Sequence, residues 1–327
     1  MNATRGIEPA VEWLRRQGHR LVVSESAVWY DPAPGVFQAF PYHPVIDPSD
    51  EELRRVFREG RARGLRYSAP LSSRCGKISY HVVCAKPSYG LANVSRQTRQ
   101  NISKGLDYAT YEPVPFVRLA KEGWALRAET LARQGRLKAE NPDWWKRLCL
   151  SAEGLPGFEA WGAFRGRTLV AALIAYLARD RYLMLYQQSL TEHLKFGVNN
   201  TLGFVFTQRS LARPEIKELF YGFQSLDASS QVDEFKFRMG YEAWPVRQRV
   251  LFHPALRPFM TPATLGAIDF CGRLGPGRPG WLKAAGLLRF YLEGNRPLSR
   301  QECPECLLPR RGEWLDKIPG RKSGQHE

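Results

Sequence analysis

The sequence of 327 residues contains no run of about eighteen apolar residues, so it predicts no transmembrane helix. Its first segment, Met1–Arg16, mixes Glu with Arg and lacks the apolar core of a secretory signal peptide. No internal low-complexity segment occurs. These absences make a cytoplasmic location the expectation.

Cysteine is also scarce, with six residues, and only Cys303 and Cys306 lie close together. A disulfide framework is therefore not expected in a large chain without a signal peptide. The Cys-Pro-Glu-Cys segment is half of a zinc site, but only Cys271 and His326 lie near enough in sequence to complete it. We expect reduced thiols in a loose tail and no metal. No serine or thiol has the spacing to His and Asp that is typical of a hydrolase triad.

Acidic residues are few relative to basic ones, 32 against 48, which gives a net charge of +16. Such a charge favours anionic partners such as coenzyme A, tRNA, other nucleic acid or an anionic lipid surface, without choosing among them. Hydrophobic residues make up 43% of the chain, which is long enough for two domains or one duplicated unit.

The most informative segment is Glu159–Tyr241. Its apolar runs and polar breaks predict a meander of three strands, then a helix that begins near Asn199-Asn200-Thr201. A strand over Glu218–Phe223 and a helix ending at Gly240 follow. The first hundred residues predict an eroded copy of this order, including a helix that Ser49 caps.

This order resembles the GNAT acyltransferase superfamily, and the pairs Phe235-Lys236 and Gly240-Tyr241 are similar to the end of the core in its FemAB-like branch. The basic segment Arg96–Gly105 is similar to the helix before the second lobe of that branch, although a solvated basic helix face explains it equally well. The resemblance implies an α+β fold with a GNAT-like, mostly antiparallel sheet flanked by helices. We expect the fold to be duplicated and to carry a C-terminal helical extension.

The expected boundaries are a degenerate GNAT-like lobe over 1–105, an acyltransferase lobe over 106–254, a helical extension over 255–294 and a basic, flexible tail over 295–327. The extension contains a strongly apolar helix around Trp281–Leu292. Packing of this helix onto the core is the main expectation, and a membrane-surface helix is the alternative.

The resemblance further implies an acyl donor in the opening between the fourth and fifth strands of the second lobe. The expected donor contacts are Gln188, Ser189, Lys195, Gly197, Val198, Asn199 and Asn200. Independently of the family, the free N–H groups at the start of a helix form an anion site, Gly197 permits close approach, and Lys195 adds charge. The loop holds one glycine where the family usually has two, a departure that puts coenzyme A in doubt. An ordinary capped helix with a polar loop is the alternative.

Two residues are candidates for catalysis. Lys236 lies four residues before Gly240, where many GNAT enzymes have a tyrosine as general acid; a fixed cation near the phosphate or the oxyanion is the simpler role. Asp227 is the candidate general base, with helix capping as its alternative role.

The leading hypothesis is an N-acyltransferase that transfers an acyl or aminoacyl group from acyl-CoA or aminoacyl-tRNA to an amine acceptor. Its basic faces could also contact tRNA or an anionic surface. The alternative is a catalytically inactive basic module of the same fold that binds nucleic acid or anionic lipid.

Overall fold

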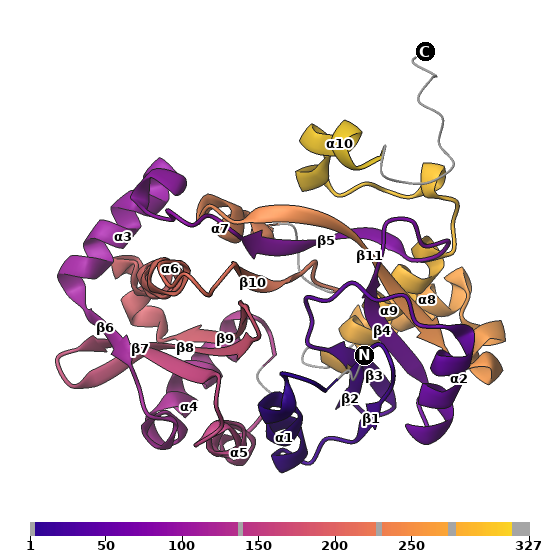
Figure 1. Ribbon diagram of the computed structural model, residues 1–327, viewed down its shortest axis with the longest axis horizontal. Coiled ribbons are helices and arrows are strands. Elements are labelled where there is room, and N and C mark those ends of the chain that lie inside the picture. The colour runs from indigo at the N-terminus through magenta and orange to yellow at the C-terminus, as the bar shows by residue number, and fades with distance from the viewer. Residues whose placement is uncertain (1–3, 137–139, 227–230, 274–278, 316–327) are drawn as a thin grey trace.

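A computed structural model describes residues 4–136, 140–226, 231–273 and 279–315 (Figure 1). The two halves of the chain repeat one order of elements, in which helix, three-strand meander, helix and strand follow one another. We call these repeats the first and second lobes. The first lobe comprises α1 (Glu8–Arg16), β1 (Leu21–Val23), β2 (Val28–Ala33), β3 (Val36–Phe40), α2 (Asp50–Glu59) and β4 (Gly64–Ala69). The second comprises α4 (Phe116–Arg133), α5 (Pro142–Ala152), β7 (Phe158–Arg165), β8 (Thr168–Ala178), β9 (Arg181–Ser189), α6 (Val198–Leu211) and β10 (Glu218–Phe223).

The remaining elements connect or extend the lobes. They are β5 (Lys77–Cys84), α3 (Arg96–Tyr108), β6 (Thr110–Pro113), α7 (Gln231–Arg238), β11 (Glu242–Phe252), α8 (Pro262–Arg273), α9 (Pro279–Gly294), α10 (Arg311–Leu315) and the 3₁₀ helices η1 (Leu91–Asn93), η2 (Thr191–Phe196), η3 (Pro254–Phe259), η4 (Leu298–Arg300) and η5 (Glu305–Arg310). The expected lobe boundary at residue 105 falls inside α3, which is therefore the connection between the lobes. No helix in the described ranges is both long and apolar enough to cross a bilayer.

The strands form one sheet in which the lobes exchange their last strands. The order is β1-β2-β3-β4-β11-β5-β10-β9-β8-β7-β6. β5, which follows the first lobe, pairs with β10 of the second lobe, and β11, which follows the second lobe, pairs with β4 of the first. β5 and β11 also pair with each other, so the sheet is continuous across the two lobes.

Local sequence explains why the elements begin where they do. The hydroxyl oxygen of Ser49 accepts a hydrogen bond from the backbone N–H of Glu52 at 3.1 Å, which caps α2 as predicted. The carboxylate of Glu52 in turn accepts from the backbone N–H and the hydroxyl of Ser26, which ties α2 to the meander. The apolar face of α2 is buried through Leu53, Val56 and Phe57.

Each lobe contains one pair of parallel strands that stay together over only three residue pairs. In the first lobe β3 and β4 pair from Val36–Gly64 to Gln38–Arg66. Beyond that point the segment that follows β3 lies beside β4 instead of β3. The N–H of Ile46 in this segment donates to the carbonyl of Ser68 in β4 at 2.9 Å. In the second lobe β9 and β10 pair only as far as Leu183–Phe220. The opening between two diverging strands is thus closed in the first lobe and present in the second.

The sheet curls so that the lobes share a buried core. A single apolar cluster combines residues of β2 and β3 with residues of β8, β9, β10, α1, α4 and α5. For example, the rings of Phe40 and Tyr176 lie 6.4 Å apart across the lobes, and those of Tyr42 and Phe223 lie 5.7 Å apart. The core therefore positions the two lobes relative to each other.

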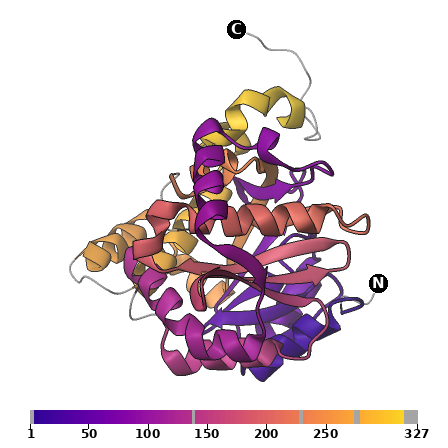
Figure 2. The same ribbon diagram turned by 90° about the vertical axis from the view of Figure 1, so that its left-hand side faces the viewer.

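The C-terminal region is more ordered than the sequence predicts. α8 and α9 form a hairpin that stands at the side of the molecule (Figure 2). Within the segment expected to be a flexible tail, Leu307 and Trp314 are buried and belong to a core cluster. The Gln301 amide oxygen accepts from the N–H of Ile78 at 2.9 Å. The prediction of a flexible tail is wrong for 298–315, because the apolar side chains of this segment pack against β5 and β11.

Candidate functional site

A pocket of about 620 Å³ opens between the lobes at the point where β9 and β10 separate. We call it the interlobe pocket. β9 and β10 contribute Met184, Leu185 and Phe220–Phe223, and α7 contributes Lys236. Tyr42 and Arg66 reach it from the first lobe, and Lys283 and Leu287 from α9. The C-terminal extension is therefore part of the pocket wall.

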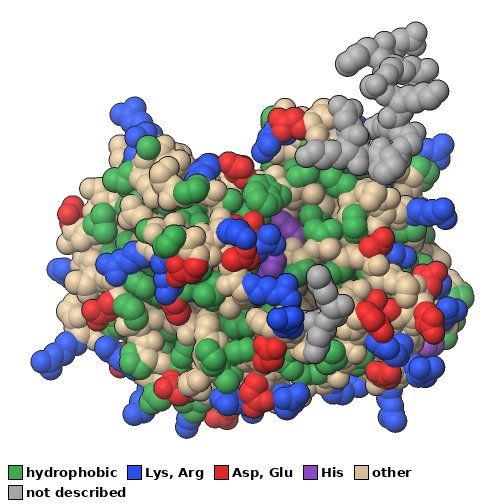
Figure 3. All heavy atoms as spheres, viewed as in Figure 1, with side chains coloured by type: hydrophobic (Ala, Val, Ile, Leu, Met, Phe, Trp, Pro, Cys, Tyr) green, Lys and Arg blue, Asp and Glu red, His purple; other side chains and the backbone are tan. Residues whose placement is uncertain are grey.

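The interlobe pocket is strongly cationic. Five of the residues that line it are basic: Arg66, Arg133, Arg136, Lys236 and Lys283. Among the described lining residues there is no Asp or Glu. Acidic and basic side chains alternate over the face of the protein drawn in Figure 3, whereas the charged side chains that line this pocket are all basic. A ligand with phosphate or carboxylate groups is the chemistry that such a wall favours.

Lys236 is held at the pocket by a buried acid. Its ammonium donates to Asp233 Oδ1 at 2.6 Å, and the hydroxyl of Tyr80 donates to Asp233 Oδ2 at 2.6 Å. Burial of Tyr80 and the nearby Asp233 raise the pKa of its phenol, so the phenol remains a donor. The ammonium also lies 5.1 Å from the centre of the Tyr221 ring. Lys236 is thus a positioned cation, as the simpler of its two predicted roles requires.

Arg133 is a second positioned cation. Its guanidinium donates to Thr191 Oγ1 at 2.7 Å and to the carbonyl of Ser189 at 3.0 Å. The nearest carboxylate with which it forms an ion pair, that of Glu129, is 4.0 Å away. Burial lowers the pKa of Arg133, against the opposing effect of Glu129. Neutral oxygens fix this side chain while leaving most of its charge for a ligand.

Both diverging strands carry a β-bulge beside the pocket. The pairing of β9 with β8 skips Leu185, and the pairing of β10 with β5 skips Tyr221. Gly222 follows with φ +142°, and no atom lies within 4 Å of the position that a β-carbon would take. Bulges release backbone groups from the sheet ladder and are common next to active sites. The peptide group of Leu185 is therefore a candidate hydrogen-bond donor to a bound carbonyl.

The first lobe supplies a phenol and a guanidinium to the same pocket. The hydroxyl groups of Tyr42 and Tyr30 form a hydrogen bond. Burial raises the pKa of Tyr42 to about 12, although the bond to Tyr30 and the charge of Arg66 act in the opposite direction. The Arg66 guanidinium lies 4.2 Å from the centre of the Phe223 ring. The phenol of Tyr42 is therefore protonated at neutral pH.

The structure assigns Gly197 a role that the sequence did not suggest. Gly197 has φ +76° and is the N-cap of α6. An added β-carbon there would lie 2.1 Å from the carbonyl oxygen of Asn101 in α3. The close approach that this glycine permits is therefore to α3. Val198 is fully buried and Lys195 is exposed, so Val198 lies in the core and Lys195 lies in solvent.

The other predicted donor contacts lie at the end of β9 and the start of α6. Gln187 connects the two diverging strands to α6, because it accepts from the Tyr221 hydroxyl and donates to the Asn199 carbonyl at 2.7 Å. Gln188 and Ser189 are both buried. The Gln188 amide has no hydrogen-bond partner among the described residues. Asn200 is half-buried near the same turn.

Asp227, the predicted general base, lies outside the described residues. Ser225 and Leu226, which precede it, both line the interlobe pocket. The carbonyl of Leu226 passes close to α9, where a β-carbon on Gly286 would lie 2.5 Å from it. The segment after β10 thus runs between the pocket and α9.

The sequence analysis did not select Arg66 or Arg133. Arg66 had a detectable signal, since it stands in the short strand β4, in which every residue is buried. An arginine in such a strand needs a polar partner or a ligand. Arg133 is one of many arginines in a helix, and no pattern distinguishes it before α4 is placed beside β9.

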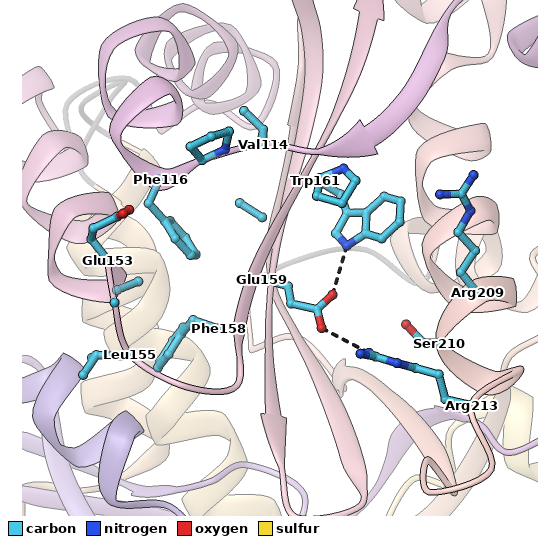
Figure 4. A pocket seen from close by; sticks show the side chains of 15 residues that line it. Val114, Phe116, Glu153, Leu155, Phe158, Glu159, Trp161, Arg209, Ser210 and Arg213 are labelled. Carbon is cyan, nitrogen blue, oxygen red and sulfur yellow. Dashed lines mark hydrogen bonds and ion pairs between the residues drawn. The ribbon is translucent and has the colours of Figure 1, made fainter.

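A larger hollow of about 810 Å³ lies at the edge of the sheet beside β7, and Figure 4 shows it from close by. Glu159 accepts hydrogen bonds there from Trp161 Nε1 and Arg213 Nη1, both at 3.1 Å. Burial raises the pKa of Glu159, but these bonds and one from Tyr182 outweigh it and lower the pKa. This carboxylate is already paired, and none of the predicted site residues lines the hollow. The interlobe pocket is therefore the better candidate.

No group of three or more residues suited to hold a metal is found in the part of the chain that the structure describes. Burial raises the pKa of the Cys306 thiol to about 11, against the effect of its contact with Tyr80. Burial also raises the pKa of the Cys303 thiol. Both thiols are therefore protonated at neutral pH, and a protonated thiol is a poor nucleophile.

The sequence matches no protein-family model, and no curated protein is similar to it in sequence. Solved structures do match the fold. FemX aligns over 76% of this chain and 92% of its own, with a TM-score of 0.53 and 10% identity. A conserved protein of unknown function from Bacteroides thetaiotaomicron aligns over 77% and 92%, with a TM-score of 0.51 and 10% identity.

The C-terminal domain of a putative lysylphosphatidylglycerol synthetase from Agrobacterium fabrum aligns over 82% of this chain and 95% of that one, with a TM-score of 0.50 and 12% identity. Identities this low establish the fold alone. The predicted fold class, a duplicated, mostly antiparallel sheet flanked by helices, is confirmed. The protein therefore has the FemAB-like, tandem GNAT fold that the sequence resembles.

Proposed function

We propose that the protein is an N-acyltransferase that transfers an aminoacyl or acyl group to an amine acceptor in the interlobe pocket. The observation that carries this proposal is the meeting of Lys236 with the two bulged, diverging strands in one cationic pocket. Acyl transfer needs a place for the carbonyl carbon, donors for the oxyanion and a route for the proton. The pocket offers the first two.

In this reaction the acceptor nitrogen attacks the carbonyl carbon of the donor and forms the C–N bond. The C–O bond of an ester or the C–S bond of a thioester breaks, and the amine proton ends on the departing oxygen or sulfur. Lys236 and the peptide N–H of Leu185 stabilise the oxyanion that forms in between. Asp227 is the proposed base, and Tyr42 is a neutral donor that can orient the acceptor or the leaving group.

Aminoacyl-tRNA suits the site better than acyl-CoA. The start of α6, which would hold the pyrophosphate of coenzyme A, is packed against α3 at Gly197 and buried at Val198. Cations gather instead around the interlobe pocket, where Arg133 and Lys236 can meet the phosphates near the end of an RNA strand. The Agrobacterium protein of similar fold, described as a putative lysylphosphatidylglycerol synthetase, supports an aminoacyl group as the one transferred.

A transfer assay with charged tRNA and with acyl-CoA thioesters, each offered with a panel of amines, tests the proposal. Lys236→Ala should lower kcat by about 10²- to 10³-fold, the usual cost of one oxyanion donor. Arg238→Ala is the matched control, because Arg238 is exposed and pairs with Glu234 at 2.8 Å on the same helix. Its kcat should stay near the wild-type value.

Folded protein that binds neither class of donor would refute the proposal. If tRNA binding weakens steeply with salt but no transfer occurs with any amine, the protein is instead the non-enzymatic basic module. Equal activity of the Lys236→Ala and Arg238→Ala variants would leave the transferase proposal standing but remove Lys236 from the mechanism.

A further inference from the structure

Large apolar side chains are exposed on η3 and on the hairpin of α8 and α9. Phe259, Phe270 and Leu282 are exposed by 63%, 61% and 52%, and Trp281 by 37%. The side chains of Trp281 and Leu282 both approach Gly272, which lies two residues after Phe270. Trp281 and Leu282 therefore lie together beside Gly272, while Phe270, two residues earlier, is exposed on another side of α8. The hairpin that carries them stands out from the molecule (Figure 2). Exposed apolar groups of this kind mark an interaction surface.

A basic hollow of about 490 Å³ lies between α2, β11 and η3. Arg54 and Arg58 of α2 line it together with Arg249 and Arg257. Asp50 is the one acid among its described lining residues. Within the described part of the chain, none of the four arginines forms an ion pair with an acid. Arg257 Nε donates to the carbonyl of Phe252 at 3.1 Å, and the buried Nε of Arg249 has no hydrogen-bond partner.

η3 connects the basic hollow to the start of the hairpin. Arg257 of the hollow and Phe259 of the exposed set are two residues apart on η3. The hydroxyl of Thr264 in α8 donates to the carbonyl of Phe259 at 2.6 Å and so ties η3 to the hairpin. Apolar anchors beside unpaired cations are the pattern of proteins that bind the interface of a bilayer.

We propose that η3, the α8–α9 hairpin and the basic hollow form a docking surface for the surface of an anionic phospholipid bilayer. Phe270, Trp281 and Leu282 enter the boundary between head groups and acyl chains, and the arginines of the hollow bind lipid phosphates. A bilayer fits better than nucleic acid, because phosphate contacts alone would leave the exposed Phe and Leu side chains in water.

Docking of this kind would place the interlobe pocket beside the bilayer. α9 presents Trp281 and Leu282 outward and Lys283 and Leu287 to the pocket. The docking surface does not depend on the proposed transferase function, since it is defined by exposed residues that take no part in acyl transfer. A binding measurement therefore tests it separately from any activity assay.

Co-sedimentation of the full chain with sucrose-loaded vesicles tests this surface. Vesicles of phosphatidylcholine mixed with phosphatidylglycerol should bind the protein, and vesicles of phosphatidylcholine alone should bind it far less. The double variant Phe270→Ser, Leu282→Ser should weaken binding at least tenfold, because each anchor alone contributes about that factor. The control is Leu91→Ser, Leu106→Ser, which removes two leucines of similar exposure (45% and 49%) from η1 and α3.

The arginines are tested by Arg54→Gln and Arg58→Gln, each of which should weaken vesicle binding about fivefold. Arg96→Gln and Arg99→Gln on α3 are the exposed controls. All variants alter exposed side chains, so their circular dichroism should match that of the wild type. The proposal is overturned if the wild type does not bind anionic vesicles, or if the hairpin variant binds as tightly as its control. The proposal is also overturned if the wild type binds RNA but not vesicles and the Arg54 and Arg58 variants lose that RNA binding. The surface would then be one for nucleic acid.

Discussion

The Gly197→Ala substitution places a methyl group between α6 and α3. The new β-carbon would lie 2.1 Å from the Asn101 carbonyl oxygen and 2.8 Å from its carbon. Contacts below 3.0 Å are not tolerated, so α3 would have to move by about 1 Å against a packed interface. The left-handed backbone at φ +76° adds a further cost for any residue with a side chain.

These two effects set the expected magnitude. The backbone conformation costs about 1–2 kcal/mol, and the forced displacement about 1–3 kcal/mol. The free energy of unfolding should therefore fall by about 2–5 kcal/mol, and Tm by about 2 °C for each kcal/mol in a chain of this size. Gly166→Ala isolates the first effect, because Gly166 has φ +58° and no atom within 4 Å of the added carbon. It should cost only about 1–2 kcal/mol.

Urea and thermal unfolding of the two variants, measured by near-ultraviolet circular dichroism, give the comparison. If both variants lose the same stability, the contact with α3 is not what Gly197 provides. Should Gly197→Ala instead keep its stability relative to Gly166→Ala and lose affinity for the donor, Gly197 serves the phosphate-binding loop that the sequence suggested.

Three further predictions concern other parts of the molecule. Burial lowers the pKa of His81 to about 3, and the charge of Arg66 acts in the same direction. The unfolded chain takes up this proton near pH 6.5, so the stability from neutral His81 is present above pH 6.5 and is lost as pH falls towards 3. His81 should contribute a loss of about 1.4 kcal/mol per pH unit in that window, in addition to the loss from His43, whose pKa burial also lowers to about 3. In unfolding at several pH values, His81→Asn should reduce the slope of stability against pH by that amount, and an unchanged slope would contradict the assignment. Gly286→Ala would crowd the Leu226 carbonyl and should raise KM for the donor more than it changes kcat, in steady-state kinetics; an unchanged KM would show that this segment does not shape the pocket. Trp314→Ala should lower the free energy of unfolding by about 3–5 kcal/mol in urea titrations, because this indole is buried in the core, whereas a loose tail would give no change.

The sequence allowed the fold to be predicted where local patterns decide it. Alternating apolar residues and turn residues located β7, β8, β9 and β10, and Ser49 located the start of α2. The strand β3 has no clear local signal, because Val36–Phe40 is short and lies between two proline-rich segments. The partner of a strand is a long-range property, so the exchange of β5 and β11 leaves no local signal.

The site was predicted only in part for the same reason. Lys236 was found because a short motif surrounds it, and the structure places it at the interlobe pocket. Arg66 and Arg133 come from different lobes and meet only through the curl of the sheet. Gly197 was predicted to permit close approach of a donor, whereas the neighbour that the structure shows there is a helix ninety-six residues earlier in the chain, at Asn101.

The exchange of last strands has a consequence for synthesis of the chain on the ribosome. β4 is complete by Ala69, yet its neighbour β11 spans Glu242–Phe252, and β5 must wait for β10. One edge of each nascent strand thus stays open until most of the chain has left the ribosome. We expect neither half to be stable when expressed alone, and the completed chain to gain its stability late and in one cooperative step.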